Sequence, residues 1–127
     1  MSGLLVVMAL REESQGEFER AGVPVLYTGV GKVNAAHALT RRLAELRAGG
    51  AAMPHVVNFG TAGSNVHPTG TLLCCRAFEQ RDMDVTPLGF ARGVTPYDES
   101  PALIEHGVVI EGLPVGVCST ADSFETG

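Results

Sequence analysis

The sequence of 127 residues lacks the cysteine patterns of a disulfide framework or a zinc site. It has only three cysteines, and because Cys74 and Cys75 are adjacent, a bond between them would be strained. There is no C-x-x-C spacing, and no histidine stands at metal-ligand spacing from a cysteine. We therefore expect Cys118 and the other two thiols to be reduced and packed in a core. We expect no bound metal.

Long apolar runs and clusters of basic residues are also missing. No segment approaches the roughly 20 apolar residues that a membrane-spanning helix needs, and the first residues lack the basic region of a signal peptide. The net charge is -5, and the nine lysines and arginines form no stripe. These absences argue against nucleic acid and membranes as partners and favour a cytoplasmic protein.

The composition provides enough apolar material for one core. Hydrophobic residues make up 45% of the chain and charged residues 18%, which argues against disorder. The length fits one domain, so we expect residues 1–127 to form a single domain. The sequence stops at residues 123–127 directly after a strand-like run. We take this abrupt stop to predict an incomplete domain.

Strands and helices alternate over the first fifty residues. The apolar run from Leu4 to Leu10 predicts a strand buried on both faces. A helical stretch is expected from Arg11 to about Ala21, followed by a strand over residues 23–27. The clearest helix follows a glycine loop at residues 28–32 and ends at Gly49-Gly50. Its expected apolar stripe consists of Val33, Ala36, Thr40, Leu43 and Leu46.

The pattern in the rest of the chain predicts mainly extended segments. Strands are expected at residues 55–59, 70–78, 85–86, 108–110 and 115–119. Residues 87–101 are rich in glycine and proline and predict a loop. Early alternation of strands and helices favours an α/β architecture with a partly parallel sheet.

Two glycine loops each follow a predicted strand, at residues 29–31 and 60–63. Ligands bind beyond the carboxyl ends of strands in open α/β sheets, and glycine lets backbone amides approach a ligand. Both loops are therefore candidate sites, with tight turns as the simpler interpretation. Neither is a dinucleotide fingerprint or a P-loop, because Asn34 and Leu26 stand where those motifs require glycine.

Acidic residues are the main candidates for acid–base chemistry. Glu12 and Glu13 follow the first strand, where a carboxylate is well placed to act as a general base, or simply to favour the helix dipole. Asp82 and Asp84 would share one face of an extended segment, as an acid/base or metal pair or as turn residues. No third metal ligand accompanies them. The four histidines are scattered, and we assign them no catalytic role.

Five segments, in order, resemble the purine nucleoside phosphorylase superfamily, and specifically its methylthioadenosine/S-adenosylhomocysteine nucleosidase branch. These segments are Met8–Glu13, Thr28–Ala36, Asn58–Gly63, Asp82–Gly89 and Ser119–Phe124. Five matches with compatible order and spacing make coincidence improbable. The resemblance spans nearly all of this chain but only about the N-terminal half of the family's domain.

The resemblance implies a fold, an activity and site residues. The fold is a three-layer α/β/α sandwich with a mixed central sheet, and the activity is hydrolysis of the N-glycosidic bond of a purine nucleoside. Glu13 resembles the carboxylate that activates the attacking water, and Phe124 the aromatic residue that stacks on the purine. Thr61, Ala62 and Gly63 resemble the loop beside the ribose and base. Relatives form homodimers or larger oligomers, and the chemistry requires no metal or organic cofactor.

Some features depart from the family pattern or leave alternatives open. The family's purine-protonating Asp and its ribose-binding Met-Glu pair belong to the half outside this sequence. Glu125 stands where many relatives carry an apolar residue, and Thr61 replaces a common serine. The Arg11-Glu12-Glu13 opening favours water over phosphate as the nucleophile. A nucleoside phosphorylase, a non-catalytic nucleoside-binding remnant and an interaction module remain the alternatives.

Overall fold

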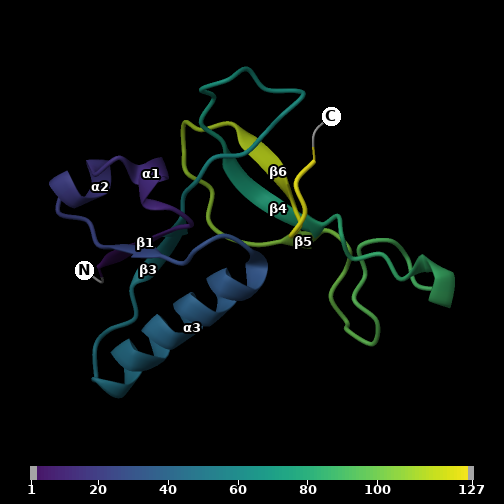
Figure 1. Ribbon diagram of the computed structural model, residues 1–127, viewed down its shortest axis with the longest axis horizontal. Coiled ribbons are helices and arrows are strands. Elements are labelled where there is room, and N and C mark those ends of the chain that lie inside the picture. The colour runs from purple at the N-terminus through teal and green to yellow at the C-terminus, as the bar shows by residue number, and fades with distance from the viewer. Residues whose placement is uncertain (1–2, 126–127) are drawn as a thin grey trace. The chain divides into compact units, whose positions relative to one another are not determined.

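The computed structural model describes residues 3–125, which form two compact units that divide between Gly63 and Ser64 (Figure 1). Each unit contains one three-stranded sheet. The α/β class that the sequence predicts is confirmed, with its strands divided between two sheets. The division follows from residues 59–73, which contain no helix or strand.

The sheet of unit 1 is entirely parallel. Strand β1 (Leu4–Met8) lies between β2 (Val25–Tyr27) and β3 (His55–Asn58). Four successive side chains of β1, from Leu5 to Met8, are each at most 5% exposed and form the core. A central strand covered on both faces cannot alternate apolar and polar residues, which explains its continuous apolar run.

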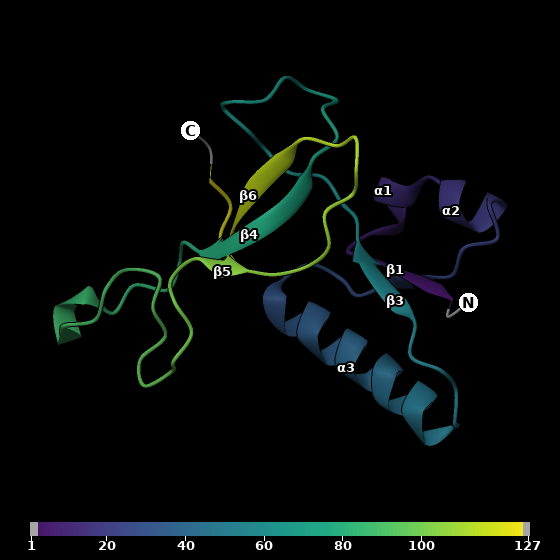
Figure 2. The same cartoon turned by 180° about the vertical axis from the view of Figure 1, so that it is seen from behind.

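Helices cover both faces of this sheet. The chain passes from β1 to β2 through α1 (Arg11–Ser14) and α2 (Glu17–Arg20), and from β2 to β3 through α3 (Lys32–Ala48). The two connections cross the sheet in opposite directions, and right-handed connections therefore place their helices on opposite faces. Figures 1 and 2 show α1 and α2 on one side of β1 and β3, and α3 on the other. Within residues 3–125 no helix combines the length and apolar character that crossing a membrane requires.

The first helical stretch is interrupted. Gln15 and Gly16 have φ angles of 50° and 76°, in the left-handed region, so one expected helix becomes α1 and α2. Glycine adopts such angles without strain, which makes Gly16 the natural breaking point.

Helix α3 has nearly the expected bounds but a different covered face. Val33 is 78% exposed, and Ala36 and Thr40 are also exposed. The half-buried face instead contains Leu39 together with Leu43 and Leu46. A face that carries Leu39 removes more apolar surface from water than one that carries Thr40, so the helix is rotated from the predicted orientation.

Unit 2 has a mixed sheet around β4 (Cys74–Gln80). Strand β6 (Val115–Thr120) pairs with β4 in parallel, and β5 (Ile104–Glu105) pairs with it antiparallel. The strand expected at residues 108–110 was wrong, because the chain pairs with β4 earlier, at Ile104 and Glu105. All three cysteines have free thiols; Cys74 is buried, and the other two are half-buried.

Residues 85–86 were also predicted wrongly as extended. Thr86–Leu88 form a single 3-10 turn, η1. Asp84 Oδ1 accepts hydrogen bonds from the Thr86 amide at 3.1 Å and the Thr86 hydroxyl at 2.7 Å. This side-chain contact turns the backbone immediately before Pro87, whose fixed φ suits the start of a helical turn.

Candidate active site

Glu13 lies in the first turn of α1, directly after the carboxyl end of β1. Its Oε1 accepts a hydrogen bond from the Leu10 amide at 3.1 Å, which ties the carboxylate to the start of the helix. An acidic residue favours this position because the first amides of a helix lack backbone acceptors. The start of the helix therefore fixes Oε1 of Glu13, and Oε2 can bind groups outside the helix.

The second oxygen of Glu13 binds the loop that follows β3. Glu13 Oε2 accepts from the Thr61 amide at 3.0 Å and from the Thr61 hydroxyl at 2.9 Å. A Cβ atom placed on Gly60 would stand 3.4 Å from this oxygen, in ordinary van der Waals contact with it. Parallel β1 and β3 end at the same edge of the sheet, which brings these two sequence-predicted residues together.

The hydrogen bonds favour the charged form of Glu13. Partial burial would by itself raise the pKa of the Glu13 carboxyl. The bonds from the Thr61 amide, the Thr61 hydroxyl and the Leu10 amide outweigh burial and lower that pKa below the usual 4.5. Glu13 is therefore ionised at neutral pH, the state that a general base needs.

A hydrogen-bond network behind Glu13 holds α1 and α2 to β2. The buried Ser14 hydroxyl donates to Glu19 Oε1 at 2.9 Å, and the Tyr27 hydroxyl donates to Glu19 Oε2 at 2.9 Å. The Arg11 guanidinium carbon lies 4.5 Å from the centre of the Tyr27 ring. The sequence does not predict this support, because Tyr27 meets Glu19 and Arg11 only when β2 pairs with β1.

The glycine loop at residues 29–31 is a turn. Gly29 and Gly31 have φ angles of 83° and 104°, which side chains disfavour. The Asn34 side chain closes this turn by donating to the Val30 carbonyl at 2.7 Å. The simpler interpretation of this loop therefore accounts for both glycines.

The loop at residues 60–63 has a different character. Ala62 and Gly63 are exposed beside Thr61, and a Cβ atom on Gly63 would meet nothing within 4 Å. Neither Gly60 nor Gly63 has a positive φ. Packing in the described chain does not require glycine at residue 63, so a role toward a ligand stays a prediction.

Phe124, the fifth predicted site residue, belongs to unit 2. Its side chain is 91% exposed and follows β6 in a segment without regular structure. Glu125 forms an ion pair with Arg81, with 3.1 Å between Oε2 and Nε. The structure thus brings together Glu13 and Thr61, and it presents Phe124 to solvent on its own unit.

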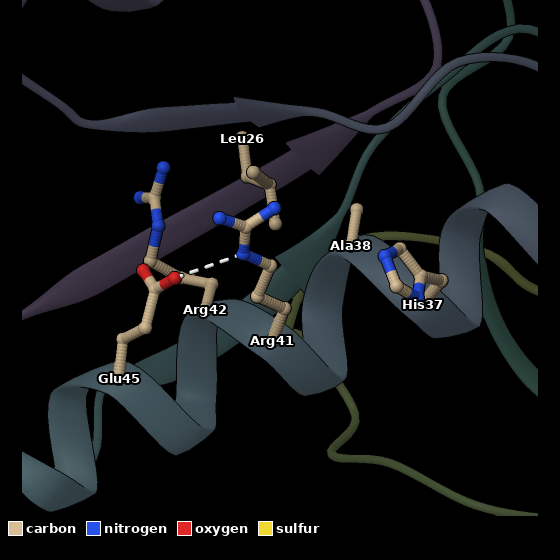
Figure 3. A pocket seen from close by; sticks show the side chains of 6 residues that line it. All are labelled: Leu26, His37, Ala38, Arg41, Arg42 and Glu45. Atoms are coloured by element: carbon tan, nitrogen blue, oxygen red, sulfur yellow. Dashed lines mark hydrogen bonds and ion pairs between the residues drawn. The ribbon is translucent and has the colours of Figure 1, made fainter.

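A cavity of about 290 Å³ in unit 1 lies away from Glu13, between α3 and β2 (Figure 3). Arg41 and Glu45, one turn apart on α3, form an ion pair at 3.0 Å beside it. It is lined by Leu26, His37, Ala38, Arg41, Arg42 and Glu45. None of the predicted site residues is among them, so we place the candidate site at Glu13 on chemical grounds.

The aspartates after β4 bond to their own unit. Asp84 holds the turn at Thr86, and Asp82 Oδ2 accepts from the Asp122 amide at 3.0 Å. In the part of the chain that the structure describes, no three His, Cys, Asp or Glu side chains gather as metal ligands would. Both aspartates therefore act on the backbone, as turn and loop residues do.

No family model matches this sequence. Among curated proteins, the chain is 33% identical over 132 residues to the 5'-methylthioadenosine/S-adenosylhomocysteine nucleosidase of Geobacillus thermodenitrificans, covering 94% of this chain and 54% of the relative. It is 31% identical over 126 residues to the same-named protein of Bacillus subtilis, covering 89% and 52%. The chain thus spans about half the length of the curated relatives it matches.

Solved structures show the same fold. A putative nucleosidase of that name from Francisella philomiragia has a TM-score of 0.80 at 20% identity, covering 98% of this chain and 66% of that one. A futalosine hydrolase mutant from Helicobacter pylori has a TM-score of 0.76 at 22% identity, covering 100% and 71%. These comparisons confirm the family resemblance and the α/β fold that the sequence predicts. The chain is similar to methylthioadenosine/S-adenosylhomocysteine nucleosidases over nearly all of its length, and it has the fold of the solved structure that carries that name.

Proposed function

We propose that this chain forms part of a purine nucleosidase that hydrolyses the N-glycosidic bond of methylthioadenosine or a similar nucleoside. The observation that carries the proposal is the Glu13 carboxylate, ionised and held by Thr61 at the edge of the unit 1 sheet. The names of the curated relatives support the same activity.

Glu13 is the proposed general base. A carboxylate has about four acceptor positions, and the Leu10 amide and the two Thr61 donors occupy three of them. One position is left to accept a proton from water as the water attacks the sugar carbon. Hydrolysis passes through a positively charged ribosyl group, which the negative charge of Glu13 also stabilises.

The remaining predicted residues would bind the nucleoside. An exposed loop formed by Thr61, Ala62 and Gly63 would lie beside the purine base, and its backbone groups can contact the ribose. Phe124 offers an aromatic face on which a purine can stack. An uncharged nucleoside suits a small apolar surface with few polar contacts.

The test is adenine release from methylthioadenosine, measured for the 127-residue chain and for a version extended through the downstream reading frame. Because the chain spans about half of its curated relatives, we expect release only by the extended version. Glu13→Gln in that version should reduce turnover about 10²–10⁴-fold, the usual contribution of a general base. Glu12→Gln is the matched control, because Glu12 is exposed and should leave turnover unchanged.

Other outcomes would replace the proposal with one of its alternatives. Turnover that requires phosphate would identify a phosphorylase. Full activity of Glu13→Gln would show that another group activates the nucleophile. If neither version releases adenine from methylthioadenosine, another nucleoside or a non-catalytic nucleoside-binding protein becomes the better interpretation.

The proposal also covers the oligomeric state, the cellular location and the metabolic role of the enzyme. The family resemblance supports a homodimer that works in the cytoplasm, in nucleoside metabolism and methionine salvage. Sedimentation equilibrium of the extended protein measures the oligomeric state directly. A monomer at all concentrations would remove the dimer from the proposal and leave the chemistry at Glu13 unaffected.

A further inference from the structure

The segment after β6 presents an aromatic side chain without help from secondary structure. Residues 121–125 form no helix or strand, and Phe124 is 91% exposed. An exposed ring on an irregular segment would ordinarily sample many orientations, and binding would then carry the entropy cost of fixing it.

Arg81, directly after β4, makes three side-chain contacts, one with the end of β6 and two with the segment that follows it. Its Nη1 donates to the Ser119 carbonyl at 3.0 Å, and its Nη2 donates to the Ser123 carbonyl at 2.7 Å. The third contact is the 3.1 Å ion pair of Nε with Glu125. The planar guanidinium can satisfy several acceptors at once, so one side chain spans the segment on both sides of Phe124.

Two further hydrogen bonds reinforce this attachment. The Arg81 amide donates to the Thr120 carbonyl at 3.0 Å, extending the pairing of β4 with β6 by one bond. Asp82 Oδ2 accepts from the Asp122 amide at 3.0 Å. Consecutive residues, Arg81 and Asp82, therefore bind two points at the end of β6 and two points in the segment after it, besides the ion pair to Glu125.

We propose that Arg81 and Asp82 are positioning residues that hold residues 119–125 so that the Phe124 ring is ready to stack on a purine base. Arg81 also neutralises Glu125, which keeps an unpaired carboxylate away from an uncharged base. The nucleoside part of this inference rests on the proposed function. The clamp itself rests only on contacts within unit 2.

The first measurement follows the ring position itself. The chain has no tryptophan, so Phe124→Trp introduces a single fluorescent indole without background. We expect Arg81→Ala to shorten the rotational correlation time of this indole while circular dichroism keeps its shape. Arg81→Lys should show the same change in milder form, because an ammonium keeps the charge but presents its donors from a single nitrogen instead of a planar fork.

Two control variants separate the clamp from general effects. Arg92→Ala removes another arginine of unit 2, which lines a surface pocket together with Arg81. Glu125→Gln removes only the ion pair and should have a smaller effect, since exposed ion pairs contribute little. Equal mobility of the introduced indole in the Arg81→Ala and Arg92→Ala backgrounds would overturn the proposal.

The second measurement is methylthioadenosine affinity of the extended protein with Phe124 intact. Arg81→Ala should weaken binding by about two- to tenfold, the cost of ordering one mobile side chain and its segment. Unchanged affinity would remove the nucleoside role of the clamp. If even the unmodified extended protein fails to bind while the introduced indole still responds to Arg81→Ala, the proposed function fails and the clamp stands.

Discussion

The Glu13 carboxylate receives donors from two places in the chain, one three residues away and the other 48 residues away. The near donor, Leu10, comes with the helix start, and the sequence pattern is sufficient to predict it. The distant donor, Thr61, requires that β1 and β3 lie side by side. An acidic residue at the start of this helix was therefore predictable at residue 13, whereas its lowered pKa depends on tertiary structure.

Thr61→Val tests this bond. It removes the hydroxyl donor and keeps the amide, so the pKa of Glu13 should rise toward its usual 4.5. A group with a lowered folded-state pKa stabilises the fold above its unfolded pKa, and this contribution is lost as the pH falls through the folded value. The variant should therefore lose about 0.5–1.5 kcal/mol of unfolding free energy at neutral pH and little at pH values well below 4.5.

The measurements are a carboxyl carbon NMR titration and urea unfolding at several pH values. Thr71→Val serves as the control, since the Thr71 hydroxyl donates to the Pro68 carbonyl and has no contact with a carboxylate. If Thr61→Val is destabilised equally at every pH, the hydrogen bond from the Thr61 hydroxyl to the ionised Glu13 carboxylate is not what stabilises the fold.

Short elements depend on partners outside their own sequence. Helix α1 has only four residues, and isolated helices of that length are not stable. Glu19, held by Ser14 and Tyr27, supplies the missing support and joins α1 and α2 to the edge strand β2. The orientation of Glu13 therefore depends on a network that does not touch it.

Tyr27→Phe tests this dependence. Loss of the hydroxyl, the main cause of the lowered Glu19 pKa, should raise that pKa. Amide hydrogen exchange should become faster over residues 14–20 and remain unchanged in α3. Tyr97→Phe is the matched control, because Tyr97 is exposed and belongs to unit 2. Equal exchange at residues 14–20 in both variants would contradict the assigned role of the network.

Elements whose local pattern and tertiary environment agree were predicted best. The buried strand β1 and the long helix α3 have nearly the expected bounds, since each is specified by a run or a period of its own. Strand β5 was missed because two residues carry no pattern and are defined only by pairing with Ala77 and Phe78. The rotated face of α3 shows the same limit, because the helix period leaves open which apolar stripe meets the sheet.

At the scale of the whole chain, many large apolar side chains are exposed. Val115 and Val117 are 54% and 61% exposed on one face of β6, which pairs with β4 alone among the described strands. Adjacent apolar residues on an edge strand commonly mediate contacts with another chain. A chain that spans about half of its curated relatives would be expected to show such surfaces.

We predict that the 127-residue chain self-associates through this face of β6. Val117→Lys places a charge on the exposed face, and because burying a valine side chain contributes about 1.5 kcal/mol or more, association should weaken at least about tenfold. Sedimentation velocity over a range of concentrations measures the effect. Val33→Lys, on an exposed valine of α3, should leave association unchanged. If the two substitutions weaken association equally, exposed apolar area in general drives association and the β6 face has no special role. A chain that stays monomeric at every concentration would refute the prediction.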